Sequence, residues 1–266
     1  MPADTTAAAP RWAFVTGAAG GIGRAVCRQL AAQGMAVFLT DLEAAPLEEL
    51  AARLREAGAP GVAWRVADVT DAAQVAAAVA EAERLGRIDA LVNIAGGSGP
   101  TPVRTIEEMD EARWRAVLDL NLTSAFLCCR ALVPGMRARR YGRVVNLSSI
   151  VARGRKGPVT TQGARLAYAT AKAALLGFTA QLAKDEAPHG ITVNAVMPAL
   201  ILAEQGSRIR ARFDALPEEA RAAMLRDLPM GRAGEAHEVA AVIGFLCSEA
   251  ASYVSGVALP IDGAFL

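Results

Sequence analysis

The sequence has few residues of the kinds that bind metals. It contains two histidines, His189 and His237, 48 positions apart, and its four cysteines form no Cys-x-x-Cys pair. Because metal sites need ligands at closer spacings, most of them are excluded and we expect no bound metal. Unpaired cysteines are usual in a reducing compartment, where they act as small buried apolar residues. We therefore expect a cytoplasmic protein.

The chain also lacks a large net charge, a signal peptide and a long apolar segment. Its 28 basic and 27 acidic residues give a net charge of +1, so nothing favours nucleic acid or an anionic membrane as a partner. Residues 1–11 contain neither the basic nor the apolar region of a signal peptide. No apolar run reaches the ~18 residues that a membrane span needs. We expect a soluble protein with a flexible N-terminus at residues 1–10.

The remaining residues alternate between short β-rich runs and longer Ala-rich helical segments. With 266 residues, of which 53% are hydrophobic, the chain is long enough to bury a substantial core. Alternating strands and helices with nearly continuous apolar strands predict an α/β fold, a parallel sheet with helices on both faces. The expected strands are 12–16, 36–40, 62–66, 89–93, 143–148, 191–197 and 257–261. The expected helices lie near 22–33, 44–57, 72–85, 107–138, 166–187 and 235–248.

No linker or internal repeat divides the chain, so we expect residues 11–266 to form a single domain. Two segments fit neither strand nor helix well. Residues 150–165 follow a strand and are typical of a loop. Residues 199–230 mix helix signals with two prolines, and long excursions of this kind are often functional, so we expect a substrate lid there.

A glycine-rich segment connects the first expected strand to the first helix. It reads Thr16-Gly17-Ala18-Ala19-Gly20-Gly21-Ile22-Gly23, the strand–loop–helix context of a dinucleotide-binding motif. Side chains at the glycines would block the backbone from a diphosphate, whose charge a helix N-terminus favours. A glycine-rich turn without a ligand is the alternative. The candidate contacts are Gly17, Gly20, Gly21, Ile22 and Gly23.

Asp41 ends the second expected strand, 24 residues after Gly17. A carboxylate at this place accepts hydrogen bonds from the adenosine ribose hydroxyls and repels the 2′-phosphate of NADP. An Asp after a strand is also a common helix cap. The position relative to the glycine loop favours the ribose role, and NAD is therefore the expected cofactor.

Tyr168 and Lys172 lie four positions apart at the start of an expected helix, so their side chains project from one face. The chain has only three tyrosines and three lysines, so a chance pair at this spacing is improbable. The alternative without a catalytic function is that the tyrosine ring packs on the hydrocarbon part of the lysine. A tyrosine hydroxyl is a weak base at neutral pH, and a neighbouring ammonium favours the phenolate. The pair therefore suits proton transfer.

In combination, these residues resemble the short-chain dehydrogenase/reductase family over residues 11–263. The motifs that carry the resemblance are Thr16-Gly17-x-x-x-Gly21-x-Gly23, Asp68-Val69, Asn93-Ile94-Ala95-Gly96, Asn121, Ser149, Tyr168-x-x-x-Lys172 and the turn at Pro198. The resemblance implies a Rossmann-type doubly wound domain whose seven-stranded parallel sheet has the order 3-2-1-4-5-6-7. It also implies a homotetramer.

The resemblance assigns roles to individual residues. Asp68 meets the adenine amino group and Val69 the ring, while the residues that end the fourth strand lie where the cofactor crosses the sheet. Lys172 holds the nicotinamide ribose. The further cofactor contacts that it implies are Asp68, Val69, Asn93, Ala95, Gly96, Tyr168, Lys172, Pro198 and Ile201.

Two more residues complete the implied catalytic group with Tyr168 and Lys172. Ser149 hydrogen-bonds the substrate oxygen, whereas Ser148 points to the opposite side of the strand. Asn121 holds a water that connects the lysine to solvent. A satisfied amide in the core is the alternative for Asn121.

The chain departs from the family pattern in three places. The 19-residue gap from Ser149 to Tyr168 is longer than expected, and its loop carries basic residues without an acid. This loop can be interpreted either as a solvated basic loop or as a contact to an anionic substrate. Ala199 replaces the usual glycine after Pro198, and Ala203 replaces a threonine that often contacts the nicotinamide.

The expected function is NAD-dependent interconversion of a secondary alcohol and a ketone. A 3-oxoacyl-thioester reductase is the alternative within the enzyme class, and a dinucleotide-binding sensor or scaffold without turnover is the alternative outside it. Two apolar stripes, on the helices at 107–138 and 166–187, are expected to pair across a two-fold axis, with the last strand forming a second interface. The alternative is that both stripes only cover the sheet. The stripes are Trp114, Leu118, Leu122 and Phe126, and Leu175, Phe178 and Leu182.

Overall fold

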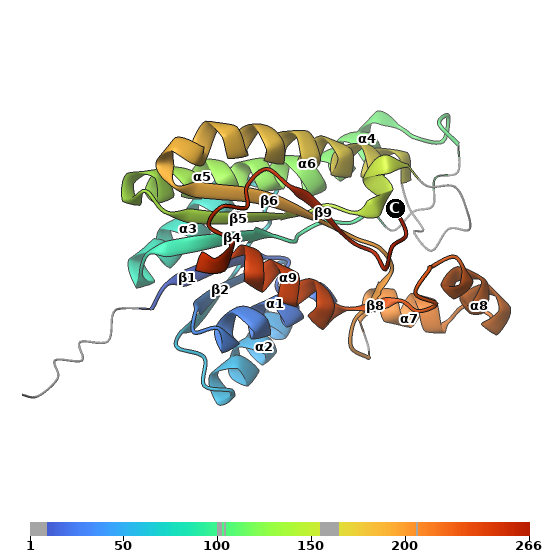
Figure 1. The fold of residues 1–266 in the computed structure, drawn as a ribbon, viewed down its shortest axis with the longest axis horizontal. Coiled ribbons are helices and arrows are strands. Elements are labelled where there is room, and N and C mark those ends of the chain that lie inside the picture. The colour runs from blue at the N-terminus through green and yellow to red at the C-terminus, as the bar shows by residue number, and fades with distance from the viewer. Residues whose placement is uncertain (1–9, 100–102, 104, 155–164, 206) are drawn as a thin grey trace, which may run out of the picture.

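The computed structural model describes residues 10–99, 103, 105–154, 165–205 and 207–266. A seven-stranded parallel sheet runs through them in the order β3-β2-β1-β4-β5-β6-β9 (Figure 1). This confirms the predicted doubly wound fold. The seventh strand of the sheet is β9 because two short strands, β7 and β8, pair separately with each other. The strands are β1 Trp12–Thr16, β2 Ala36–Asp41, β3 Val62–Val66, β4 Ile88–Asn93, β5 Gly142–Leu147, β6 Ile191–Pro198, β7 Ile201–Leu202, β8 Gly234–Glu235 and β9 Ala258–Ile261.

Two expectations fall largely outside the described residues. The flexible N-terminus at 1–10 lies there apart from Pro10, and so do residues 155–164 of the basic loop.

Two layers of helices cover the two faces of the sheet, as Figure 1 shows. Successive side chains of a strand point to opposite faces, so Ala13 and Val15 of β1 join one core while Trp12 and Phe14 join the other. The first core is covered by α1 Gly21–Ala32, α2 Ala44–Glu56 and α9 Ala236–Leu246. The second is covered by α3 Ala72–Leu85, α5 Ser124–Arg139 and α6 Arg165–Glu186.

The helix ends follow local sequence signals. Asp71 caps α3, its Oδ1 accepting hydrogen bonds from the backbone N–H groups of Ala73 and Gln74 at 2.8 and 3.2 Å. Gly34 follows α1 with φ +82°, a left-handed conformation that other residues rarely adopt.

The segment predicted as one helix at 107–138 is interrupted. It comprises α4 Glu111–Leu118, a π-helical turn at Asp119–Thr123, and α5. A π turn inserts one residue into a helix and frequently lies at a functional site. The whole stretch Glu111–Arg139 is long and apolar enough to cross a membrane by length and composition, but half of its apolar window is buried within the protein. That burial is typical of a core helix.

The two expected apolar stripes are not equally exposed. Phe126 on α5 is 43% exposed, but on α6 Leu175 is buried, and Phe178 and Leu182 pack against the core of the sheet. The α6 stripe therefore covers the sheet. The outward side of α6 instead carries the small exposed residues Ala173, Ala174 and Gly177.

The expected lid contains two helices. After β7, the chain forms α7 Arg208–Asp214 and α8 Glu218–Arg226 before it returns through β8 to α9. These helices extend beyond the carboxyl ends of the strands (Figure 1). The β7–β8 pair anchors both ends of this excursion.

A cluster of arginines lies at the opposite rim of the sheet, where the strands begin. Arg11 donates hydrogen bonds to the Tyr141 hydroxyl at 3.0 Å and to Glu249 at 2.8 Å. The guanidinium of Arg143, itself buried, lies 4.4 Å from the centre of the Tyr141 ring and contacts Glu249 at 3.3 Å. Arg87 lies 5.7 Å from the same ring. Cation–π contacts and ion pairs thus join the starts of β1, β4 and β5 to the 3₁₀ turn Glu249–Ala251 that follows α9.

Candidate active site

The glycine-rich loop needs glycine because other parts of the chain approach it closely. Gly17 has φ +64°, and a Cβ there would lie 2.8 Å from the backbone nitrogen of Ala95. A Cβ at Gly23 would lie 2.1 Å from the carbonyl oxygen of Gly17. The Thr16 hydroxyl accepts hydrogen bonds from the backbone N–H groups of Ile94 and Ala95, at 3.1 and 3.2 Å. The loop is therefore fixed against the end of β4.

The first turn of α1 begins within this loop. Gly20 is the residue before the helix, and its N–H donates to the Gly17 carbonyl at 3.2 Å. Ile22 is half-buried against the core. The free N–H groups and positive dipole end of α1 are thus directed at the carboxyl rim of the sheet, a ready site for an anion.

Asp41 lies beside the glycine loop, at the end of β2. Its Oδ2 accepts a hydrogen bond from the Ala19 N–H at 2.9 Å, and its Oδ1 accepts one from the Leu42 N–H at 2.8 Å. Each oxygen keeps a further lone pair that can accept a ribose hydroxyl. Arg24, which the sequence did not single out, donates from Nε to the Ala19 carbonyl at 2.9 Å. Asp41 and Arg24 therefore hold the same loop residue from its two sides.

A buried polar chain lies beneath the ends of β4 and β5. Asn93 donates from Nδ2 to Asn146 Oδ1, and Asn146 donates from Nδ2 to the Thr179 hydroxyl, both at 2.9 Å. The Oδ1 of Asn93 is buried and has no hydrogen-bond partner among the described residues. The Asn93 side chain thus points into the sheet. Asn146 and Thr179 lie in ordinary apolar runs, which gave no signal of this contact.

Asn121 lies within the π turn and joins the long helix to the end of β4. Its Nδ2 donates to the Gly97 carbonyl at 2.7 Å and to the Val117 carbonyl at 2.8 Å, and its Oδ1 accepts from the Gly97 N–H at 3.0 Å. A Cβ at Gly96 would lie 2.6 Å from Asn121 Oδ1 and 3.1 Å from Lys172 Nζ. Gly96 therefore lets the amide and the ammonium approach each other.

Lys172 is buried in the middle of this group, with 2% of its surface exposed. Its Nζ donates to the Leu147 carbonyl at 2.6 Å and lies 5.6 Å from the centre of the Tyr168 ring. Burial disfavours the charged form and lowers the pKa of Lys172 to about 7. A lysine with such a pKa both accepts and releases a proton at neutral pH.

The two serines after β5 point in different directions, as expected. The Ser148 hydroxyl donates to the Lys172 carbonyl at 2.8 Å and is buried. Ser149 precedes the 3₁₀ turn Ile150–Arg153, and its Oγ accepts from the Val151 N–H at 3.4 Å. That turn packs against α6, which carries Tyr168 and Lys172.

Tyr168 is half-buried at one edge of a small apolar cluster. The centre of the cluster is Val117 and Ala167, and Val103, Met109, Trp114 and Tyr168 pack against these two residues. An apolar wall therefore lies beside the phenol, and a substrate with a hydrocarbon part would fit against it.

The remaining expected cofactor residues lie along the carboxyl rim. Asp68 follows β3 and its Oδ1 accepts from the N–H and hydroxyl of Thr70 at 2.9 and 2.7 Å, while Val69 is buried. Pro198 ends β6, and Ile201 begins β7 with 5% of its surface exposed. None of these residues lies at the amino rim.

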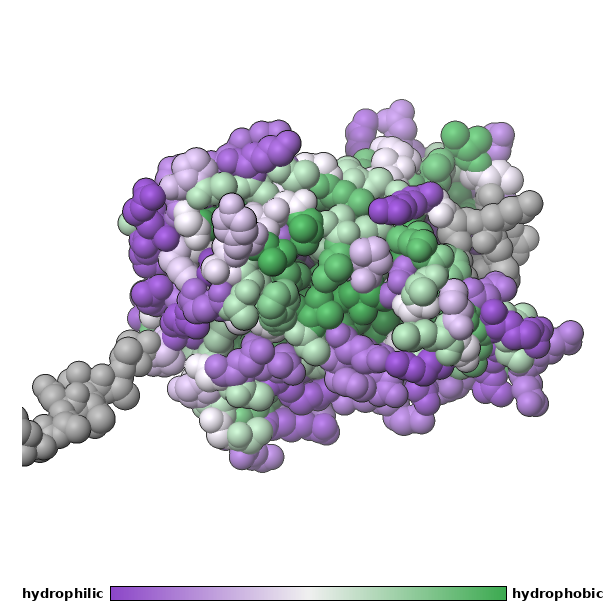
Figure 2. Space-filling model, viewed as in Figure 1, coloured by the Kyte–Doolittle hydropathy of each residue, from purple (hydrophilic) through white to green (hydrophobic). Residues whose placement is uncertain are grey.

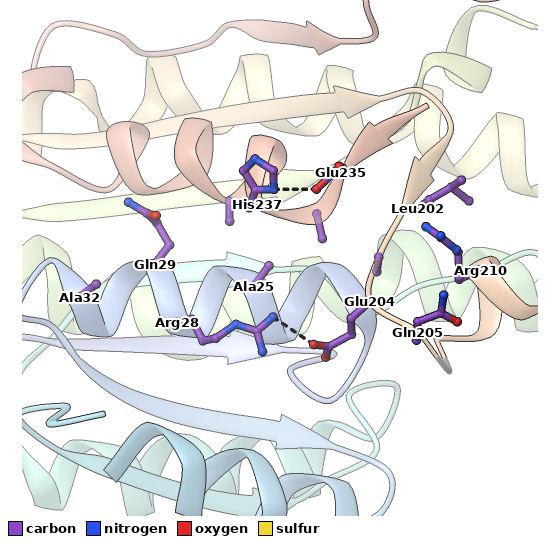
Figure 3. Close-up of a pocket in the computed structure, with 13 residues that line it drawn as sticks. Ala25, Arg28, Gln29, Ala32, Leu202, Glu204, Gln205, Arg210, Glu235 and His237 are labelled. Carbon is purple, nitrogen blue, oxygen red and sulfur yellow. Dashed lines mark hydrogen bonds and ion pairs between the residues drawn. The ribbon is translucent and has the colours of Figure 1, made fainter. Parts of the chain in front are cut away.

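A cavity of about 570 Å³ lies between α1 and the start of α9 (Figure 3). It is bounded by α1, the start of α9 and residues 202–205. Arg28 and Glu204 form an ion pair across it at 3.5 Å, and His237 contacts Glu235 at 3.2 Å. The four expected catalytic residues do not line it. Within the part of the chain that the structure describes, no three His, Cys, Asp or Glu side chains are grouped to hold a metal ion.

Comparisons with known proteins agree with this geometry. The family model described as Enoyl-(Acyl carrier protein) reductase matches residues 17–265. The galactitol 2-dehydrogenase (L-tagatose-forming) of Cereibacter sphaeroides is 39% identical, over 95% of this chain and 94% of its own. The 3-oxoacyl-(acyl-carrier-protein) reductase of Pseudomonas aeruginosa is 37% identical, over 94% and 95%.

Solved structures agree as well. A 3-oxoacyl-(acyl-carrier protein) reductase from Brucella melitensis with bound NAD is 32% identical with a TM-score of 0.83, over 96% of this chain and 91% of its own. The chain therefore belongs to the short-chain dehydrogenase/reductase family of NAD(P)-dependent oxidoreductases that interconvert alcohols and ketones.

Proposed function

We propose that this protein oxidises a secondary alcohol with NAD, or reduces the matching ketone with NADH, with Tyr168 as the proton-transfer residue. The observation that carries the proposal is the buried Lys172 ammonium, which lies 5.6 Å from the Tyr168 ring and beside Asn121. A lysine is rarely buried without a function because the desolvation of its charge is costly. The same arrangement would serve no purpose in a sensor without turnover.

The residues of the carboxyl rim fit a dinucleotide. Gly17, Gly21 and Gly23 allow the close packing that fixes the loop at the start of α1, whose free N–H groups would bind the diphosphate, and Asp41 has lone pairs for the adenosine ribose. The backbone beyond Asn93 and the loop from Pro198 to Ile201 flank the crossing point, with Asp68 and Val69 at the adenine end. When bound, the cofactor supplies the hydride acceptor or donor for the reaction.

The catalytic group divides its work among four side chains. Ser149 orients the substrate oxygen through its hydroxyl, and Tyr168 accepts the hydroxyl proton in the oxidative direction. Lys172 stabilises the phenolate and binds the nicotinamide ribose. Asn121 holds the water through which the proton leaves.

The cofactor is NAD rather than NADP in this proposal. Asp41 places a carboxylate where NADP carries its 2′-phosphate, and like charges there oppose binding. Arg24 does not offset this repulsion, because its guanidinium is already bound to Ala19 and to Glu49, at 2.9 and 3.1 Å.

A 3-oxoacyl-thioester reductase is the second candidate. The 37% identity to the Pseudomonas aeruginosa reductase favours it, whereas the 39% identity to galactitol 2-dehydrogenase favours a free alcohol or ketone. The apolar cluster around Tyr168 fits either substrate. Whether residues 155–164 contact an anionic part of the substrate is tested by the same assay, because a carrier-linked or acidic substrate would then be preferred.

We also propose a cytoplasmic homotetramer. Exposed apolar residues gather over β9 and α9 in Figure 2; the large exposed apolar residues in or near these two elements are Phe245, Tyr253, Val257 and Leu259. The outward faces of α5 and α6, with Phe126 and the small residues of α6, form the second surface. Two isologous contacts of this kind generate a tetramer with three two-fold axes. Four free, buried cysteines suit a reducing cytoplasm.

The decisive experiment is a panel of secondary alcohols, hydroxy acids and 3-hydroxyacyl thioesters with NAD, in which NADH absorbance is measured. We expect turnover of at least one substrate, and Tyr168→Phe to lower kcat by about 10² or more while NADH binding stays within a factor of two to three. Tyr253→Phe, which loses the same hydroxyl outside the proposed catalytic group, is the matched control. A Tyr168→Phe variant that keeps most of the wild-type rate would contradict the assignment of the base.

A further inference from the structure

Ser148 contacts α6 through a hydrogen bond that the helix backbone does not require. Its hydroxyl, which is buried, donates to the carbonyl oxygen of Lys172 at 2.8 Å. That carbonyl lies inside α6, where it also accepts the backbone N–H four residues later in the chain. An alanine at position 148 would therefore leave no buried polar group unpaired. Folding alone does not require the hydroxyl.

A second hydrogen bond joins the same two segments in the opposite direction. The Lys172 ammonium donates to the carbonyl oxygen of Leu147, the residue before Ser148, at 2.6 Å. The end of β5 thus supplies an acceptor to the side chain of the lysine and a donor to its backbone. The two bonds together hold both ends of Lys172 against neighbouring residues of one strand.

Side chains at the end of β5 bind α6 at two points along its length. Asn146 and Ser148 are two positions apart, so they point to the same face of the sheet. Asn146 donates to the Thr179 hydroxyl at 2.9 Å, and Thr179 lies two turns after Lys172. Two directional contacts at different heights resist sliding of the helix along the strand, whereas apolar packing is non-directional. Of the two, the Ser148 contact is the one nearer the site.

The Ser148 contact also lies between the proposed catalytic groups. Ser149 follows it directly in the chain, and Tyr168 lies one turn before Lys172 on the same face of α6. In the proposed function the hydroxyls of Ser149 and Tyr168 contact the same substrate oxygen. Their relative position therefore affects the rate strongly.

We propose that Ser148 is a positioning residue of the active site. By binding the Lys172 carbonyl, its hydroxyl holds the first turns of α6, and Tyr168 with them, in register with the end of β5. The proposal rests on the function proposed above, because it concerns the same catalytic group. Ser148 acts through the position of α6 and not on the substrate, since its hydroxyl is buried and already donates to the helix.

The test compares two substitutions that each remove one contact between the end of β5 and α6. Ser148→Ala removes the contact beside the site, and Thr179→Val removes the contact two turns away while it keeps the shape of the side chain. Thr179→Val leaves the Asn146 amide buried without its acceptor, so it should lower the stability more than Ser148→Ala does.

Three properties of both variants and of wild type are measured. Thermal unfolding gives the stability, and NADH fluorescence gives the Kd of the cofactor. The pH dependence of kcat and kcat/KM is then measured with NAD and a secondary alcohol that wild type oxidises.

We expect the activities to rank in the opposite order to the stabilities. Ser148→Ala should lower kcat about tenfold or more, because displacements of ~1 Å between reacting groups have effects of this size. It should also raise the apparent pKa of the basic group seen in kcat/KM by about half a unit or more, since the ammonium then favours the Tyr168 phenolate less. Thr179→Val should keep kcat within about threefold of wild type, with the same apparent pKa. In both variants the Kd of NADH should stay within about threefold of wild type, because the diphosphate and adenosine contacts lie on other elements.

Three results would overturn the proposal. If Ser148→Ala keeps the kcat and the apparent pKa of wild type, the hydroxyl does not position the catalytic group. If both variants lose activity in proportion to their stability, with an unchanged apparent pKa, the contact only stabilises the fold. If Ser148→Ala is less stable than Thr179→Val or no longer binds NADH, the hydroxyl is required for folding. Failure of the proposed function is distinct from these results, because wild type itself would then oxidise no substrate of the panel.

Discussion

Lys172→Met removes the buried ammonium at the centre of the site while keeping a side chain of similar length. The substitution should abolish turnover, but its effect on stability is the sharper test. Wild type must hold a charge in a buried position at low pH, whereas the variant has no charge to bury. We therefore expect Lys172→Met to be more stable relative to wild type at pH 6 than at pH 8.5.

The magnitude follows from the two pKa values of Lys172. The pKa is about 7 in the folded protein and 10.5 is its ordinary value. Between these values the unfolded chain binds a proton that the folded protein does not, so the stability of wild type increases as the pH rises. Below pH 7 Lys172 is protonated in both the folded and the unfolded protein, so the free-energy cost of burying its charge is fully present. Integrated from pH 6 to 8.5, this linkage amounts to about 2 kcal/mol.

Urea denaturation of both proteins at half-unit pH steps, without cofactor and at one protein concentration, measures the difference. The lost hydrogen bond to the Leu147 carbonyl shifts the difference by a constant amount at every pH. All other ionisable groups are common to both proteins and cancel. Lys184→Met, at an exposed lysine of the same helix, should show no trend. If the stability difference between wild type and Lys172→Met stays constant within about 0.5 kcal/mol across this pH range, burial does not lower the pKa of Lys172.

Three further outcomes are expected. Wild type should use NAD at least tenfold more efficiently than NADP, and Asp41→Ala should narrow this ratio, mainly by weakening NAD; equal efficiencies in wild type would contradict the role of Asp41. Gly23→Ala should weaken NADH binding and cost about 1–3 kcal/mol of stability, because its Cβ would lie 2.1 Å from the Gly17 carbonyl oxygen; NADH titration and thermal unfolding measure the two effects, and wild-type values in both would contradict this reasoning. Light scattering at micromolar concentration should give the mass of four chains for wild type, and Phe126→Asp should yield smaller species; a wild-type monomer would exclude both proposed interfaces.

The sequence predicts the strands of the sheet closely because each is a short apolar run. The predicted bounds 12–16 and 62–66 coincide with β1 and β3, and the other sheet strands differ by one residue at one end or, in β5, at both ends. The inner strands β1, β2, β4 and β6 are buried along nearly their whole length, so their apolar pattern is almost continuous and easily bounded. The two-residue strands β7 and β8 have no such pattern, since their pairing depends on where the lid returns.

The interruption of the long helix could not be predicted in the same way. The apolar spacing around Asn121 continues across the π turn without a break, so the sequence indicates one regular helix. The extra residue is stabilised by the two hydrogen bonds between Asn121 and Gly97, which lie 24 positions apart in the chain. Contacts of that separation leave no local signature.

The site residues show the same division between local and distant determinants. The spacing of Tyr168 and Lys172 is local, so the sequence predicts that they share a helix face. The Lys172 ammonium donates to the backbone carbonyl of Leu147. Every residue has such a carbonyl, so the sequence does not indicate which one the lysine contacts. Arg24 was missed because it acts through its place beside the glycine loop, where its Nε donates to the Ala19 carbonyl.

The cluster of arginines around Tyr141 makes the two rims of the sheet mechanically different. At the amino rim, Arg11, Arg143 and Glu249 tie strands and the end of a helix together through charged contacts. The carboxyl rim has longer connections instead, among them the segment with α7 and α8 between β7 and β8. Insertions and substitutions in those connections can therefore alter which substrate is accepted without loosening the sheet. The stiffness of the sheet thus depends on its amino rim and the choice of substrate on its carboxyl rim. Either property can change in evolution without the other.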